Sequence, residues 1–156
     1  MSNCIDMVTE HKVFELNDQV VSIEFNGVLP GPPGPAGPAG GSAVTWTAGQ
    51  NLSTGRVVII DNGEAFYFQP SNTAHQGRAY GITITSATQG ANVDVQISGE
   101  RADAAFSFTA DTPVWVDADG EIVNTQPVTG ALIQLAGVAS GAKKLVIDFS
   151  LSIKRN

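Results

Sequence analysis

The stretch PGPPGPAGPAGGS, residues 30–42, decides how this chain is organised. Glycine stands at every third position, and the spaces between are filled mostly by proline. The residues concerned are Gly31, Pro32, Pro33, Gly34, Pro35, Gly37, Pro38 and Gly40. Three polyproline-II chains can wind together only if the residue that faces their common axis has no side chain. The period therefore predicts that three copies of the chain associate along this segment.

We interpret residues 30–42 as a collagen-like stalk of a homotrimer, about 30–35 Å long at roughly 3 Å per residue. The alternative is a stiff spacer within one chain, because proline and glycine are common in linkers. A spacer has no need of glycine in strict register, which favours the triple helix. A triple helix this short would melt unless folded segments held its ends, so the flanking regions are expected to associate as well.

Residues 1–29 precede the stalk and contain two short β-forming runs, 13–16 and 20–25, around a turn at Asn17-Asp18. A two-stranded hairpin alone is marginal in water and must pack onto something larger. We interpret it as an anchoring segment; the alternative is that it adds strands to the domain after the stalk. The candidate anchoring residues are Val13, Phe14, Leu16, Val21, Ile23 and Phe25.

Residues 43–156 are predicted to form one all-β domain, because β-branched and aromatic runs alternate with turn residues and no helical period appears. The predicted strands are 56–60, 65–68, 79–85, 93–97, 105–108, 114–116, 132–138 and 145–153. In the last of them Leu145, Ile147, Phe149, Leu151 and Ile153 alternate with mostly polar residues. This alternation predicts one long strand that buries those five side chains.

A weak internal repeat runs through this domain. Residues 58–64, VIIDNGE, correspond to residues 114–121, VWVDADGE, and each contains a turn, Asn62-Gly63 or Asp119-Gly120. Further matches follow in the same order: Pro70 with Pro127, Gly81-Ile82 with Gly137-Val138, and 93–97 with 145–149. Two copies are too few for a solenoid, so we predict two similar β-units in one small barrel or sandwich.

The second repeat, with 114–121, Pro127, Gly137-Val138 and the run 145–153, resembles the small capsid decoration (cement) and head-fibre proteins of tailed bacteriophages. GPP and GPA triplets that join an anchor to a trimeric knob are also typical of phage fibres. The resemblance implies a β-tulip-like or small barrel fold, a homotrimer, and attachment to the major capsid protein or another virion protein. It implies a location on the virion surface and no catalytic residues. Residues 1–29 have no counterpart in it.

Charge and composition argue against several other partners. The eight basic residues are scattered in a chain of net charge −7, so no positive face can follow a row of phosphates, and we expect no nucleic acid. The single cysteine, Cys4, cannot form an intrachain disulfide. No run has the length to cross a membrane, and the N-terminus lacks the pattern of a signal peptide. We expect synthesis in the host cytoplasm without secretion.

The chain offers few candidates for chemistry. Residues 117–121, DADGE, resemble the start of a calcium loop, but Val128 stands where a bidentate glutamate is needed, so we predict a hairpin turn. His11, His75 and Cys4 lack zinc spacing; three axial copies of His75 could bind an ion, but a solvated loop histidine is the simpler interpretation. Asp61 and Glu64 are interpreted as exposed loop charges. We therefore expect no enzyme, no metal and no cofactor.

Two functions remain open. The first is a virion structural protein, and the second is a trimeric receptor-binding or glycan-binding fibre tip that recognises the host surface. The aromatic residues available for a sugar are Trp46, Tyr67, Tyr80 and Trp115. Aromatic side chains are normally spent on packing, so a core position is expected first for each. A secreted protein of the animal collagen type is disfavoured by the lone cysteine and the missing signal peptide.

Overall fold

The computed structural model describes residues 11–16, 19–24 and 41–155, with side chains from residue 41 onward. The chain separates into two compact units, Met1–Pro35 and Ala36–Asn156, and each is described here by itself. The predicted stalk residues Gly31 to Gly40 and the candidate anchor Phe25 lie outside the described residues. Within the described ranges, no helix has the length and apolar character to span a membrane.

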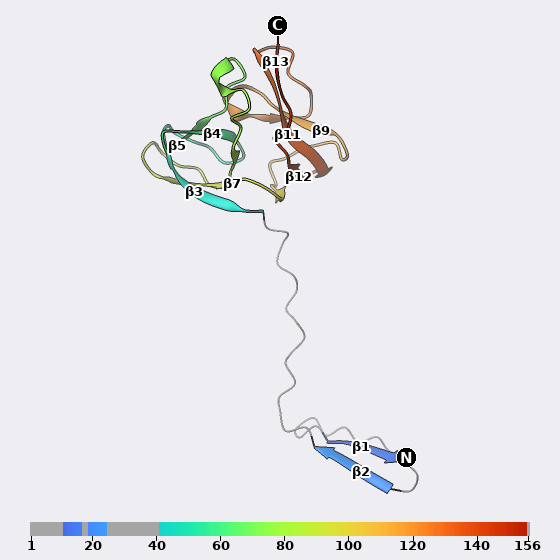
Figure 1. The fold of residues 1–156 in the computed structure, drawn as a ribbon. Coiled ribbons are helices and arrows are strands. Elements are labelled where there is room, and N and C mark those ends of the chain that lie inside the picture. Colours follow the sequence, from blue (N-terminus) through green and yellow to red (C-terminus); the bar gives the residue numbers. More distant parts are fainter. Residues whose placement is uncertain (1–10, 17–18, 25–40, 156) are drawn as a thin grey trace. The chain divides into compact units, whose positions relative to one another are not determined.

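The N-terminal unit contains the predicted hairpin (Figure 1). Strands β1 (His11–Leu16) and β2 (Gln19–Glu24) are antiparallel, and Leu16 pairs with Gln19. The register also pairs Phe14 with Val21. Directly opposed residues of an antiparallel pair occupy the same face, and every second residue along a strand returns to that face. Of the candidate anchoring residues, Phe14, Leu16, Val21 and Ile23 therefore occupy one face of the hairpin, and Val13 occupies the other.

The C-terminal unit begins with a closed five-stranded barrel in the order β3-β5-β4-β6-β7. Its strands are β3 (Ala43–Ala48), β4 (Val57–Asp61), β5 (Glu64–Tyr67), β6 (Gly81–Thr83) and β7 (Asn92–Gln96). The turn between β4 and β5 is the predicted Asn62-Gly63, with φ angles of 49° and 84°. Two consecutive positive φ angles match the twist of a tight hairpin, which is why this dipeptide marked the turn. Strand β3 was not predicted.

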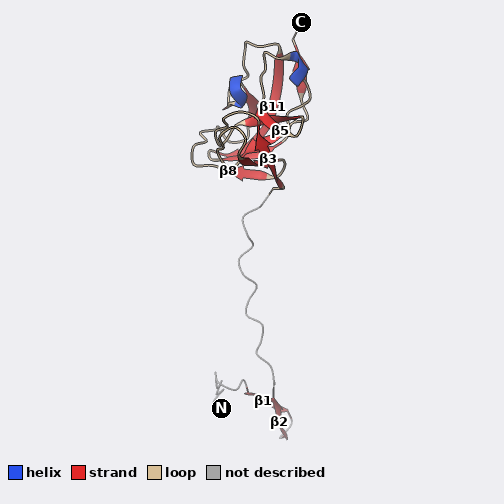
Figure 2. Cartoon of the chain, turned by 90° about the vertical axis from the view of Figure 1, so that its left-hand side faces the viewer, coloured by secondary structure: helices blue, strands red, loops and turns tan. Residues whose placement is uncertain are grey.

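A second sheet follows in the order β10-β9-β11-β12-β8, with β13 added on β11. Its strands are β8 (Glu100–Ala102), β9 (Pro113–Val116), β10 (Ile122–Val123), β11 (Leu132–Gly141), β12 (Lys144–Ile147) and β13 (Ser152–Lys154). Two short 3-10 helices, η1 (Thr73–His75) and η2 (Ala118–Gly120), appear in blue in Figure 2. The described part of the chain is therefore all-β, as predicted.

The strand pairing of the second sheet repeats that of the barrel. Strands β8 to β12 occur in the spatial order that β3 to β7 have in the barrel. Val58 of β4 lies opposite Gly81 of β6, and Val114 of β9 lies opposite Gly137 of β11 in the same way. The matched glycines seen in the sequence therefore occupy equivalent places in two similar units.

Strands β7 and β12 are equivalent in the two β-units, but their residues align differently from the sequence match. Ile82 pairs with Gln96, and its counterpart Val138 pairs with Val146, so Gln96 is equivalent to Val146. The sequence comparison had set Asp94 against Val146, which is two residues out of register. A shift of two keeps every side chain on its own face, so the apolar pattern could not detect it.

The first β-unit closes into a barrel, and the second does not. In the barrel β3 and β5 form a parallel pair through Thr47 and Ala48, whereas the second sheet stays open between β8 and β10. The predicted strand 105–108, which would lie at this opening, is wrong: it is a loop in which Phe106 donates its backbone N–H to Asp103. Its apolar pattern reflects burial of Phe106 and Phe108, whose rings lie 4.7 Å apart between centroids.

The single terminal strand predicted for 145–153 is also wrong, because the run divides into β12 and β13. Leu145 and Ile147 are buried as predicted, but Leu151 and Ile153 are 38% and 45% exposed. The break coincides with a register shift in β11. There the buried amide nitrogen of Gln134 donates to main-chain carbonyls of the segment between β12 and β13, at 3.0–3.2 Å.

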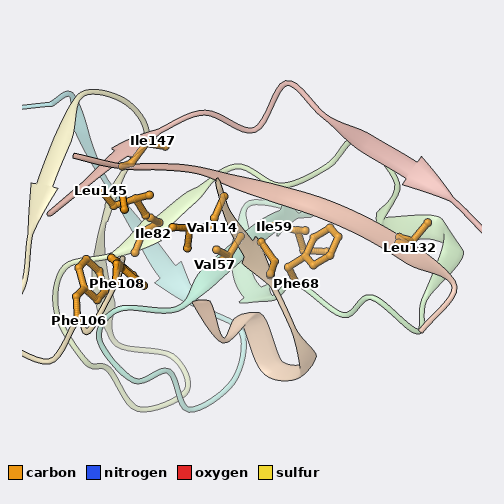
Figure 3. Packing of buried hydrophobic residues seen from close by; sticks show 13 residues of the cluster. Val57, Ile59, Phe68, Ile82, Phe106, Phe108, Val114, Leu132, Leu145 and Ile147 are labelled. Atoms are coloured by element: carbon orange, nitrogen blue, oxygen red, sulfur yellow. The ribbon is translucent and has the colours of Figure 1, made fainter. Parts of the chain in front are cut away.

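The main core lies within the C-terminal unit, between the barrel and the second sheet (Figure 3). The outer face of β4 and β6 fills the open concavity of the second sheet, and a smaller core fills the barrel itself. The main core consists of Val57, Ile59, Phe68, Ile82, Phe106, Phe108, Val114, Val116, Leu132, Ala136, Ala139, Leu145 and Ile147. The barrel core consists of Ala48, Leu52, Val58, Ala65, Val93 and Val95. Each large apolar side chain buried here contributes roughly 1.5–3 kcal/mol.

Candidate functional site

His75 is buried against the barrel, with 8% of its surface exposed. The side chain of Asn72 caps η1 by accepting the N–H of Ala74 at 3.0 Å, and the turn that follows lays His75 against Phe68, 5.8 Å between ring centroids. Its Nδ1 accepts the backbone N–H of Gln69 at 3.0 Å. The predicted solvated loop histidine is therefore wrong, because packing and a hydrogen bond fix the ring.

A hollow of about 390 Å³ opens beside His75 and also contains Tyr67, Asp61 and Arg78. Three of its polar side chains have partners within the chain. Arg78 Nη2 lies 2.7 Å from Asp61 Oδ1, and the Tyr67 hydroxyl accepts the N–H of Ser53 at 2.7 Å. Asp61 is therefore paired with an arginine and, at 49% side-chain exposure, remains a surface charge.

Stability is expected to depend on the protonation of His75. Burial, and then the charge of Arg78, lower the pKa of this imidazole below 6.5, against a smaller opposite effect of Asp61. Because the unfolded chain binds the proton more tightly, this contribution is present above pH 6.5 and is lost as pH falls toward the folded pKa. Urea midpoints should therefore decrease between pH 7.5 and pH 5.5 on the ordinary titration scale of histidine.

The control for this prediction is His75→Asn, whose Oδ1 takes the place of Nδ1 and can accept the same N–H but does not titrate. Its urea midpoint should vary less over that pH range than the midpoint of the unsubstituted chain. The pKa values of Glu100 and Asp148 are lowered from 4.5 and 3.8 by hydrogen bonds, so these groups take up protons below the pH range of the experiment. An equal slope in the two proteins would show that His75 is not the titrating group.

The acidic loop 117–121 forms the predicted turn and also contacts the segment that follows β5 of the barrel. Asp117 Oδ1 accepts the N–H of Ala118 at 2.8 Å, and Asp119 Oδ1 accepts the Gln69 side-chain amide at 2.6 Å. Gly120, at φ 65°, donates its N–H to the Phe68 carbonyl at 2.9 Å. The Asp119 carboxylate and the Gly120 main chain therefore join the second β-unit to the barrel, a role that the sequence did not indicate.

The aromatic residues considered for sugar binding have separate roles. Trp46 and Tyr80 pack edge to face at 5.6 Å and, with Tyr67, lie against the barrel core, as expected. Trp115 does not follow that expectation. Its neighbours Val114 and Val116 are fully buried, so strand alternation places Trp115 on the opposite, outer face, where it is half-buried.

A larger hollow, of about 690 Å³, lies at the open side of the second sheet, between the loop 105–108 and the segment 122–129. This is the place where the parallel pair closes the barrel in the first unit. Asn124 bridges the two sides: its Nδ2 donates to the Ser107 carbonyl at 2.8 Å, and its Oδ1 accepts the Thr109 N–H at 3.3 Å. Within the described ranges, no three His, Cys, Asp or Glu residues cluster as metal ligands would.

Comparison with protein families gives the chain a family. A family model described as phage cement protein matches residues 38–145, which run from just before β3 into β12. The chain belongs to the phage cement protein family. The match includes the barrel and most of the second sheet, and the family makes this cement protein a structural, capsid-associated component of a phage virion. A comparison with curated proteins found no match.

Proposed function

We propose that this cement protein is a homotrimeric, non-enzymatic head fibre. Residues 1–29 attach it to the major capsid protein or another shell protein, the collagen-like segment holds three chains in register, and residues 43–156 project from the virion surface as a knob. The family match across both β-units is the observation that carries the proposal.

The trimer is supported by the glycine period and by the way the chain enters the barrel. The glycine register ends at Gly40, and β3 begins at Ala43. Between them, a Cβ atom added to Gly41 would lie 1.5 Å from the Ser98 carbonyl oxygen, so the chain passes directly against the barrel wall. A stalk held this closely would transmit its register to the knobs.

The anchoring role is supported by the hairpin of the N-terminal unit. Phe14 and Val21 pair across its strands, and four of its candidate anchoring residues share one face. A two-stranded hairpin is marginally stable by itself and gains stability by docking on a larger surface. A capsid shell provides such a surface.

The non-enzymatic role is supported by the hollow beside His75. The Nδ1 atom of this histidine is held by a backbone N–H, and Asp61 is held by Arg78. General acid–base chemistry needs such groups available to a substrate.

Binding to capsids that lack this protein should depend on the hairpin face. The full chain should co-sediment with such capsids, whereas Phe14→Asp combined with Ile23→Asp should reduce binding at least tenfold, about 1.4 kcal/mol, because two charges would be buried at the contact. Val128→Asp is the control, since Val128 is 89% exposed and lies in the knob. Undiminished binding of the double variant would contradict the anchoring role.

A further inference from the structure

An apolar row crosses the outer face of the second sheet. Pro113 on β9 pairs with Val138 on β11, which in turn pairs with Val146 on β12. Val138 and Val146 are 44% and 43% exposed, and Pro113 is exposed as well. These three residues are called the outer row; Trp115, half-buried, follows on the same face of β9. Figure 1 shows β9, β11 and β12 side by side.

The first unit has the same row, and there it is covered. The equivalent residues are Val57, Ile82 and Gln96, which pair in the same registers and are 0%, 0% and 7% exposed. Val57 and Ile82 are covered by the inner face of the second sheet; Figure 3 shows them among its side chains, including Val114 and Leu145. The row is thus buried in the first copy of the repeat, and the equivalent row of the second copy is exposed.

The charge at the border of the outer row is already compensated. Glu100 on β8 pairs with Val146 and thereby continues the row across the sheet. One of its carboxylate oxygens accepts the Ser140 hydroxyl at 2.7 Å, and the other lies 3.0 Å from the ammonium of Lys144. A partner could cover the row without leaving this carboxylate unpaired, which is the costly case.

We propose that the outer row binds the knob of a second copy of this chain, and that this contact holds the three knobs of the trimer together. The inference rests on the trimer of the proposed function. The glycine register ends three residues before β3, so a wound stalk would hold the knobs at an effective concentration on the order of millimolar. At that concentration an apolar contact of modest area is sufficient.

The contact can be tested by the trimer–monomer equilibrium of the full chain, measured by sedimentation velocity over a dilution series. Val146→Lys should raise the trimer dissociation constant at least tenfold, about 1.4 kcal/mol. Val128→Lys is the matched control, because it makes the same substitution at an exposed valine in the loop after β10 and should leave the constant unchanged. Val138→Thr, which keeps the shape of the side chain, should weaken the trimer less than Val146→Lys.

The outcomes separate this inference from the proposed function. A trimer that is equally stable in the unsubstituted chain, Val146→Lys and Val138→Thr would overturn the outer-row contact and leave the trimer in place. A monomeric unsubstituted chain would overturn both. Circular dichroism checks the fold of each variant, and if Val146→Lys fails to fold, Val138→Thr decides the outcome.

Discussion

Replacing Gly137 with alanine is expected to destabilise the knob by more than about 4 kcal/mol, enough to prevent folding of many domains. Gly137 has a φ angle of 150°, which side chains rarely adopt. A Cβ atom there would lie 1.9 Å from the Val146 carbonyl oxygen and 3.1 Å from the Asp148 nitrogen. Both obstacles are main-chain atoms, one in β12 and one in the residue after it, so β11 and β12 would have to separate. Urea unfolding, or the yield of soluble protein, measures the effect.

Two further glycines separate the contribution of contact from that of backbone strain. Gly90 has a φ angle of 83° and open space around it, so Gly90→Ala should cost about 1–2 kcal/mol from strain alone. Gly81, the counterpart of Gly137, lacks the positive φ, but its added Cβ would lie 2.6 Å from the Gln96 carbonyl oxygen. Gly137→Ala should therefore be the most harmful of the three. If it cost no more than Gly90→Ala, the close approach of β11 and β12 would be in error.

Removing the charge of Asp103 should cost on the order of 3 kcal/mol. Its Oδ2 lies 2.8 Å from Nη2 of Arg101, and the two side chains are only 19% and 8% exposed. Within the described residues, the Nε atom of Arg101 has no hydrogen-bond partner, so Asp103 carries most of the compensation for this buried guanidinium. In Asp103→Asn the guanidinium would stay buried without a counter-charge. Urea unfolding at neutral pH measures the loss.

The matched control is Asp61→Asn. Asp61 Oδ1 and Arg78 Nη2 are similarly close, at 2.7 Å, but their side chains are 49% and 40% exposed. Water solvates both charges, so this substitution should cost less than about 1 kcal/mol. Equal costs for the two asparagine variants would mean that burial of Arg101 does not set the strength of its ion pair.

Local patterns predicted a large part of the fold. The Asn62-Gly63 turn follows from the positive φ angles that a tight hairpin requires, and the repeated glycines Gly81 and Gly137 mark equivalent close approaches of strands. The alternation at Leu145 and Ile147 also indicated the buried face correctly. The turn and the alternation depend on residues within a few positions of one another, and the glycines were found because the same short pattern occurs twice.

The candidate site was less accessible to the same reasoning. His75 lies in a polar segment, and its burial depends on Phe68 and on a backbone N–H supplied by Gln69. Trp115 was expected in the core because valines flank it, although the same alternation places it on the opposite face. An Asn72 cap three residues before His75 was the one local signal that could have indicated an ordered turn.

The amino-acid order alone was enough to indicate an all-β chain, a twofold repeat and a glycine register before residue 41, because turn chemistry, alternation and a three-residue period are patterns of short stretches. Folding in three dimensions settled which copy of the repeat closes into a barrel, where the terminal run breaks, and which of two equivalent apolar rows is covered. Those outcomes depend on contacts between segments far apart in the chain, where the outer face of the barrel fills the concavity of the second sheet. A pattern of neighbours in sequence carries no information about such a partner.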